Sequence, residues 1–200
     1  MNPKLIPWVF VWIWSTGFIA AKYGLPYAEP FTLLSYRFVI TLFFLLILII
    51  YKKSPWPETR LDFFHLLIAG VLIHGVYLGG VFFSISKGMP TGIAALIVTL
   101  QPILTNALSG PILNEKVSTK QWVGVLLGFV GAALVLGFDV GSKIPTTGLV
   151  ATIIALLAIT FSTLWQKKLS GKLSLSVSNG YQAFGGCVFN LILVYLLFLH

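Results

Sequence analysis

Long apolar runs, bounded by charged or turn-forming residues, recur along the whole chain. The stretch 43–50, for example, contains only phenylalanine, leucine and isoleucine. About 20 apolar residues in a helix cross a hydrocarbon core of about 30 Å, and a helix satisfies its own backbone polar groups in lipid. A membrane β-barrel would instead show alternating segments of about ten residues. The pattern predicts an all-α polytopic membrane helical bundle of seven spans, near Leu5–Tyr23, Phe31–Tyr51, Phe63–Phe83, Gly92–Leu113, Gln121–Phe138, Thr147–Trp165 and Gly180–Leu199.

The composition agrees with a bilayer as the surrounding solvent. Of the 200 residues, 58% are hydrophobic and 9% charged, and the mean hydropathy is +0.96. Such values lie outside the range of soluble domains. The net charge of +8 could suggest nucleic acid as a partner, but a nucleic-acid-binding face needs a polar surface, so we expect none. The single cysteine, Cys187, cannot form an intrachain disulfide, and the three histidines lack a second ligand at metal spacing. We expect neither a metal nor a cofactor, and the chain lacks the glycine-rich phosphate-binding motif of ATP-dependent proteins.

The basic residues are distributed unequally between the two sides of the predicted bundle. Nine fall on one side and three on the other, which by the positive-inside rule predicts a cytoplasmic N-terminus and a multi-pass protein of the cytoplasmic membrane. Four tryptophans near the same boundaries agree with this orientation. The nine are Lys4, Lys52, Lys53, Arg60, Lys116, Lys120, Lys167, Lys168 and Lys172, and the three are Lys22, Lys87 and Lys143.

Two short segments of the chain repeat in the same order. Trp14-Ser15-Thr16 corresponds to Phe161-Ser162-Thr163 at an offset of 147, and Ser35-Tyr36-Arg37 to Gly180-Tyr181-Gln182 at an offset of 145. About five spans lie within this period, and an odd number reverses the orientation of the second copy. The sequence therefore predicts an inverted repeat, with a first copy of five spans over residues 3–139 and a partial second copy of two spans over residues 146–200.

The region after the third span carries a set of motifs. Residues 88–104 read GMPTGIAALIVTLQPIL, followed by Leu113-Asn114-Glu115-Lys116 and by Gln121-Trp122-Val123-Gly124 at the start of a glycine-spaced span. This pattern resembles the EamA family of the drug/metabolite transporter superfamily. The resemblance implies a carrier of ten spans, five plus five, in which substrate binds between two inverted repeats. This chain would hold the first seven spans of such a carrier.

Two features lie well inside predicted spans, the charge of Arg37 and the pair Gln101-Pro102. Arg37 is costly in a membrane, by at least about 2.5 kcal/mol, and is a candidate substrate-binding residue. Alternatively, its side chain reaches the interface or pairs with Glu29. In the fourth span, Pro102 removes a backbone donor and Gln101 adds an amide at mid-membrane. This helix break either exposes polar groups to a central cavity or is a packing kink.

Further substrate-binding candidates lie in the repeated segments. Trp14 offers an aromatic face for stacking, whereas for Ser15 and Thr16 helix packing is favoured over a binding role, because hydroxyls in membrane helices can satisfy their own backbone. Tyr36 precedes Arg37 and fits the same family pattern. If the inverted pairing holds, Tyr181 and Gln182 face the same central space as Tyr36 and Arg37.

Paired glycines predict close helix contacts. Gly75 and Gly79 lie on one face of the third span, and Gly124 and Gly128 on one face of the fifth. Spacing of this kind permits close approach of two membrane helices, and we assign it to packing within the chain, with a homodimer as the alternative.

We interpret the chain as a secondary transporter that moves a small organic metabolite by alternating access, and not as an enzyme. All five acidic residues lie in loops or at span ends, so no buried carboxylate is available for proton relay. One alternative is a non-transporting fragment or membrane assembly subunit. Another is a membrane enzyme acting on lipid-linked substrates, which would require a cluster of His, Asp or Glu near an interface.

Overall fold

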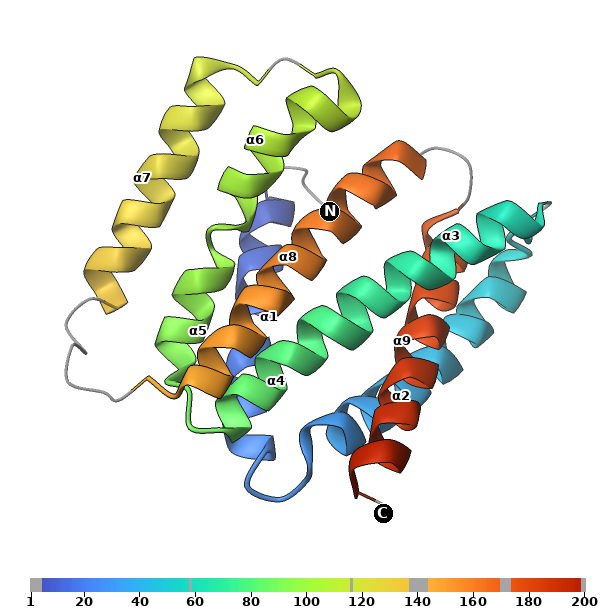
Figure 1. The fold of residues 1–200 in the computed structure, drawn as a ribbon. Helices are drawn as coiled ribbons and strands as arrows, with labels where there is room; N and C mark the ends of the chain where they lie inside the picture. Colours follow the sequence, from blue (N-terminus) through green and yellow to red (C-terminus); the bar gives the residue numbers. More distant parts are fainter. Residues whose placement is uncertain (1–4, 58, 116, 137–143, 170–173, 199–200) are drawn as a thin grey trace.

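The computed structural model describes residues 5–57, 59–115, 117–136, 144–169 and 174–198, and within them the regular elements are helices (Figure 1). Lys4, Lys116, Lys143 and Lys172, and the boundaries expected at residues 3, 139 and 200, lie outside this part. The elements are α1 (Ile6–Gly24), α2 (Pro30–Lys52), α3 (Arg60–Gly70), the π-helix η2 (Val71–Tyr77), α4 (Leu78–Ser86), α5 (Thr91–Val98), α6 (Gln101–Leu113), α7 (Thr119–Leu136), α8 (Thr146–Leu169) and α9 (Leu175–Phe198).

The chain is a multi-pass membrane protein. Within the described residues, five helical segments are long and apolar enough to cross a bilayer, and their outward faces expose large apolar side chains such as Phe43, Phe44 and Ile50. The segments are Pro30–Lys52, Arg60–Ser86, Thr91–Leu113, Thr146–Lys167 and Leu175–Leu197. Helices α1 and α7 coincide with the first and fifth expected spans but are not among these five.

Local sequence explains where several helices begin and end. Pro30, which has no N–H to leave unpaired, opens α2, and Lys53 closes it in the left-handed conformation (φ 49°). The side chain of Thr59 accepts a hydrogen bond from the backbone N–H of Asp62 (3.1 Å) and so caps α3. Asn114 ends α6 with φ 55°, again in the left-handed region.

Successive helical segments run in opposite directions through the bundle (Figure 1). Helices α2, α6 and α8 finish at the end of the bundle where α1 begins, and helices α1, α4 and α7 finish at the other end (Figure 1). The basic residues Lys52, Arg60, Lys120 and Lys167 consequently gather at the first end.

The core forms where the continuous segment α3–η2–α4 passes between α8 and α9, with α2 on the far side of α9 (Figure 1). Its buried side chains include Leu34, Phe38, Tyr77 and Ile159. Helix α7 packs against α5 and α6, at the edge of the bundle.

Single glycines allow the closest contacts between these helices. A Cβ on Gly70 would lie 2.2 Å from the backbone oxygen of Gln182, and a Cβ on Gly185 would lie 2.7 Å from that of Leu67. Each helix, α3 and α9, therefore supplies one glycine to a shared backbone contact.

The four glycines expected to mediate packing differ in their surroundings. A Cβ on Gly75 would meet the Phe189 ring at 2.5 Å, and one on Gly79 would meet the Phe31 ring at 3.0 Å. At Gly124 and Gly128 a Cβ would have no described atom within 4 Å. Helix α7 thus places its glycine pair against open space among the described residues.

Candidate functional site

Two cavities share a wall made by Trp14 and Phe18 of α1 and Ile73 of η2. The smaller, about 170 Å³, lies between α1, α2, η2 and α4. The larger, about 790 Å³, lies between α1, η2, α5, α6, α7 and α8. A lone buried cavity of about 150 Å³ accommodates a benzene ring, so each of these spaces is large enough for a small organic solute.

The smaller cavity combines one cation with aromatic walls. Arg37 of α2 lines it together with Trp14, Phe18, Tyr77 and Phe82. The guanidinium carbon of Arg37 lies 6.0 Å from the centroid of the Phe38 ring. Because a guanidinium donates in a planar fork that matches a carboxylate, the cavity is chemically suited to a solute with one carboxylate and an apolar body.

The π-helix η2 supplies two further polar groups, His74 and Tyr77, to the same cavity. The backbone oxygen of His74 accepts a hydrogen bond from the Asn190 side-chain amide (3.2 Å), which also donates to the Gly186 oxygen (2.7 Å). The imidazole ring lies 4.8 Å from the Phe38 ring, centroid to centroid. Helix α9 is thereby tied to the wall of the cavity, and π-helical turns often occur at functional sites.

The larger cavity borders the break in the fourth expected span. Helix α5 ends at Val98 and α6 begins at Gln101, with Pro102 in its first turn. The Gln101 amide nitrogen donates to the hydroxyls of Thr105 (3.1 Å) and Thr163 (3.3 Å), so it joins α6 to α8. Gln101, Pro102 and Thr163 all line this cavity.

The structure brings together some of the expected site residues and separates others. Trp14 lines both cavities, while Arg37 lines the smaller one and Gln101 and Pro102 line the larger one. Tyr36 is 68% exposed on α2 and is not among the residues that line these two cavities. The side chain of Ser15 lies outside the described part of the chain.

Tyr181 and Gln182 lie away from both cavities. The Tyr181 ring makes edge contacts with Phe63 (5.2 Å between centroids) and Trp56 (6.0 Å), in a pocket beside the start of α3. Gln182 is 4% exposed and its backbone lies against Gly70. In this conformation, the two residues support the α3–α9 contact.

Sequence reasoning did not select His74, Tyr77 or Thr163 for this site. His74 is an ionisable residue in the middle of a span, which is itself a signal of function. Thr163 belongs to the repeated segment Phe161-Ser162-Thr163 but was not singled out within it. Tyr77 had no distinguishing signal, because aromatic residues are frequent throughout the chain.

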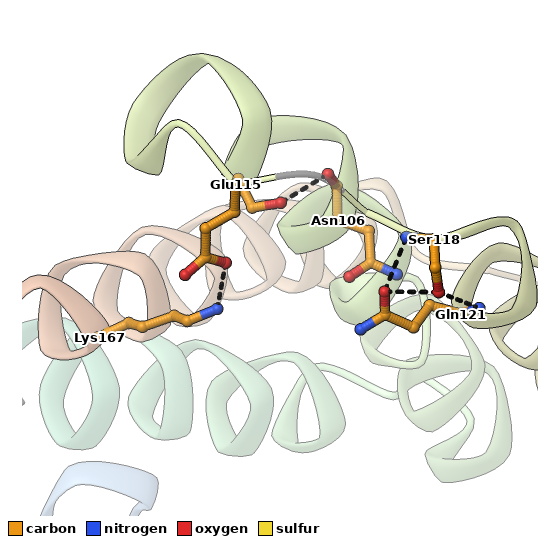
Figure 2. Close-up of polar contacts among 6 residues, drawn as sticks. Asn106, Glu115, Ser118, Gln121 and Lys167 are labelled. Carbon is orange, nitrogen blue, oxygen red and sulfur yellow. Dashed lines mark hydrogen bonds and ion pairs between the residues drawn. The ribbon is translucent and has the colours of Figure 1, made fainter.

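Two separate sets of polar contacts lie at the end of the bundle where α1 begins, one between the segment after α6 and helix α8 and one within the start of α7 (Figure 2). Glu115, just after α6, forms an ion pair with Lys167 of α8. Gln121 and Ser118 form a capping box at the start of α7: the Ser118 backbone N–H donates to the Gln121 side-chain oxygen (2.8 Å), and the Gln121 N–H donates to the Ser118 hydroxyl (3.3 Å).

Comparison with known proteins gives consistent results. The profile of the EamA-like transporter family matches residues 7–137. An uncharacterised transporter of Archaeoglobus fulgidus is 30% identical over 62% of this chain and 44% of its own. A probable amino-acid metabolite efflux pump of Salmonella typhimurium is 26% identical over 78% of this chain and 50% of its own. Protein PecM of Dickeya dadantii is 28% identical over 87% of this chain and 57% of its own. The chain spans about half the length of the curated relatives it matches.

Proposed function

Because the chain belongs to the EamA-like transporter family, we propose that it moves a small organic metabolite across the cytoplasmic membrane by alternating access. The observation that carries this proposal is the position of Trp14 between two cavities, one with Arg37 and the other with Gln101 and Thr163. A solute that moves past Trp14 would meet polar groups on both sides of one aromatic residue. Such a site can hold a solute without offering it a continuous open pore.

The proposed substrate is an amino acid or a related metabolite with one carboxylate and an apolar side chain. Arg37 would bind the carboxylate, and Trp14 with Tyr77 would contact the apolar part. Tyr181 and Gln182, which lie outside this cavity in the present conformation, would contribute only in another conformation of the transport cycle. The Salmonella relative is named a probable amino-acid metabolite efflux pump, and this name supports the proposed substrate class and outward transport.

We further propose seven spans with a cytoplasmic N-terminus, arranged as an inverted repeat over residues 3–139 and 146–200. In support, α1 and α8 run in opposite directions, as do α2 and α9, and these are the pairs that the sequence offsets relate (Figure 1). The gathering of basic residues at the end where α1 begins supports the orientation. Cysteine-accessibility labelling of single-cysteine variants at Ser54 and Lys87 tests it: only Lys87→Cys should react from outside intact cells, in the Cys187→Ser background.

Transport itself is tested in proteoliposomes that contain the full 200-residue chain. A ¹⁴C-labelled mixture of L-amino acids is added outside vesicles loaded with the same unlabelled mixture, and the entry of label by exchange is measured. We expect exchange that is abolished by Trp14→Ala and retained by Gly124→Ala, which alters an open position on α7. If correctly inserted protein exchanges no amino acid, this substrate proposal is wrong, and flux of no solute in a wider panel would favour the non-transporting fragment or assembly subunit.

A further inference from the structure

A third cavity lies at the end of the bundle where α1 and α4 finish and α5 begins (Figure 1). This end cavity, lined among others by Lys22, Ser86 and Gly88, has a volume of about 600 Å³, which is in the range of pockets that bind small organic molecules. Thr91 and Gly92, in the first turn of α5, line both the end cavity and the larger cavity. The three cavities therefore form a row in which each neighbouring pair shares lining residues.

The two ends of this row each carry a cation. Arg37 lines the smaller cavity, and Lys22 lines the end cavity. The larger cavity between them has no charged side chain among its lining residues, and its polar groups are neutral, as in Gln101 and Thr163. A carboxylate that leaves Arg37 and moves along the row therefore meets its next cation at Lys22.

The ammonium of Lys22 is available to a ligand. Its side chain is exposed and forms no ion pair within the described part of the chain. Glu29, just before α2, is the one acidic residue described at this end of the bundle, and it does not line the end cavity. Lys87, the other lysine described at this end, does not line the cavity either, and its Nζ lies 5.2 Å from the centroid of the Phe83 ring. Lys22 is thus the cation that the cavity presents.

The turn between α4 and α5 gives the end cavity a fixed wall. Gly88 has φ 87°, a conformation that favours glycine, and its N–H donates to the Ile85 carbonyl (3.0 Å). The Met89 N–H donates to the Ser84 carbonyl (3.0 Å). A Cβ on Gly148 would lie 3.0 Å from the Cβ of Met89, so the first turn of α8 packs against this wall. Backbone hydrogen bonds and helix packing therefore shape the cavity before any ligand enters.

We propose that the end cavity is a second, weaker binding site, in which Lys22 holds the carboxylate of an amino acid that has left Arg37. This inference rests on the proposed amino-acid transport. A lysine ammonium attracts a carboxylate as a point charge, without the planar fork of arginine, and water screens a pair at an exposed side chain. The ammonium of the solute stays hydrated in such a cavity and needs no acidic partner. Weak binding suits a site near the surface, from which the solute must dissociate.

The test reads occupancy of the end cavity directly, by the reactivity of a cysteine placed in its lining. Ser86→Cys is introduced into the full chain in the Cys187→Ser background, and its rate of reaction with an uncharged maleimide is measured in detergent solution. The L-amino-acid mixture should slow this reaction, because the bound solute covers residue 86. The corresponding amino-acid amides, which lack the carboxylate, should not. Lys87→Cys, at the next position but outside the lining, should react at the same rate with and without solute.

Substitutions at the two cations assign the protection to one of them. Lys22→Gln should raise the concentration of amino acids that gives half-maximal protection of Ser86→Cys about two- to fivefold, as expected for an exposed charge pair. Lys22→Arg keeps the charge and should restore protection. Arg37→Gln, which weakens binding in the smaller cavity, should leave the protection of Ser86→Cys unchanged. Each rate is compared with and without solute in the same variant, so differences in basal reactivity cancel.

Several results would overturn the inference. Equal protection with and without the Lys22 charge would do so, as would protection by the amides or an equal shift in Arg37→Gln, which would indicate one site instead of two. Because Lys22 is exposed, its replacement is not expected to prevent folding. Exchange of the ¹⁴C-labelled mixture in proteoliposomes without any protection of Ser86→Cys would reject the second site and leave the transport proposal intact. Absence of exchange would defeat the transport proposal itself.

Discussion

The contact between α3 and α9 predicts a strong response to a single methyl group. Gly70 has ordinary helical dihedral angles (φ −66°, ψ −44°), so alanine is conformationally acceptable there. Its Cβ, however, would lie 2.2 Å from the oxygen, 2.5 Å from the Cα and 2.7 Å from the carbonyl carbon of Gln182. These are backbone atoms and cannot rotate away, so the two helices must separate by roughly 1 Å to restore van der Waals contact.

The magnitude follows from two opposing effects. Overpacking of this kind costs about 1–3 kcal/mol, and replacing glycine by alanine in a helix returns up to about 1 kcal/mol. We expect Gly70→Ala to lower the free energy of unfolding by about 1–2 kcal/mol, a change of roughly 5- to 30-fold in the ratio of folded to unfolded protein. Reversible unfolding in mixed detergent micelles, followed by the fluorescence of the six tryptophans, measures this difference.

Two further variants separate the steric clash between α3 and α9 from the general effect of replacing glycine by alanine in a helix. Gly124→Ala, at a position with no described atom within 4 Å of the added Cβ, should leave stability unchanged or raise it slightly. Gly185→Ala places the added methyl group on α9 and separates the same two helices. The double variant with Gly70→Ala should therefore lose less free energy of unfolding than the sum of the two single losses. Wild-type stability of Gly70→Ala would refute the close contact between α3 and α9.

Three more outcomes are expected. Arg37→Gln should raise the concentration of carboxylate solutes needed for half-maximal exchange about tenfold to hundredfold, since a charge-assisted hydrogen bond contributes about 1.5–3 kcal/mol, and amide analogues should be unaffected in the same assay. Gln101→Ala and Thr163→Ala should each lower the free energy of unfolding by about 1 kcal/mol. Because both remove the same hydrogen bond, the double variant should lose less than the sum of the two single losses, and additive losses would contradict the presence of this bond. Glu115→Gln should change stability by less than about 1 kcal/mol because its partner Lys167 is half exposed, and a larger loss would show that the ion pair contributes more than its exposure implies.

The positions of the spans were predictable because membrane helices are set by apolar length and by the residues that end it. The second span was expected over Phe31–Tyr51 and extends over Pro30–Lys52, between a proline and a lysine. The third was expected from Phe63 and begins at Arg60, because the Thr59 cap adds a turn that hydrophobicity does not mark. To predict a helix end that is set by a cap, individual polar residues such as Thr59 must be considered in addition to hydrophobicity.

The π-helix was not predictable from the same pattern. Residues 71–77 lie inside a continuous apolar run, and the choice between α and π hydrogen bonding there leaves no mark on hydrophobic periodicity. The close α3–α9 contact was missed for a related reason. Reading for paired glycines finds two on one helix, as at Gly75 and Gly79, whereas this contact takes Gly70 from one helix and Gly185 from another. Contacts between helices depend on crossing geometry, which a single segment does not contain.

The repeated segment Phe161-Ser162-Thr163 shows how far a motif can locate a site. Ser162 is fully buried and its hydroxyl donates to the Ala69 carbonyl of α3 (3.0 Å), so it serves helix packing. The hydroxyl of Thr163, the next residue, accepts a hydrogen bond from the Gln101 side-chain amide at the larger cavity. Successive helical residues point about 100° apart, so one short motif necessarily divides between two surroundings. The repeated segment includes a residue that lines the larger cavity, but the neighbouring helices determine which of its hydroxyls reaches it.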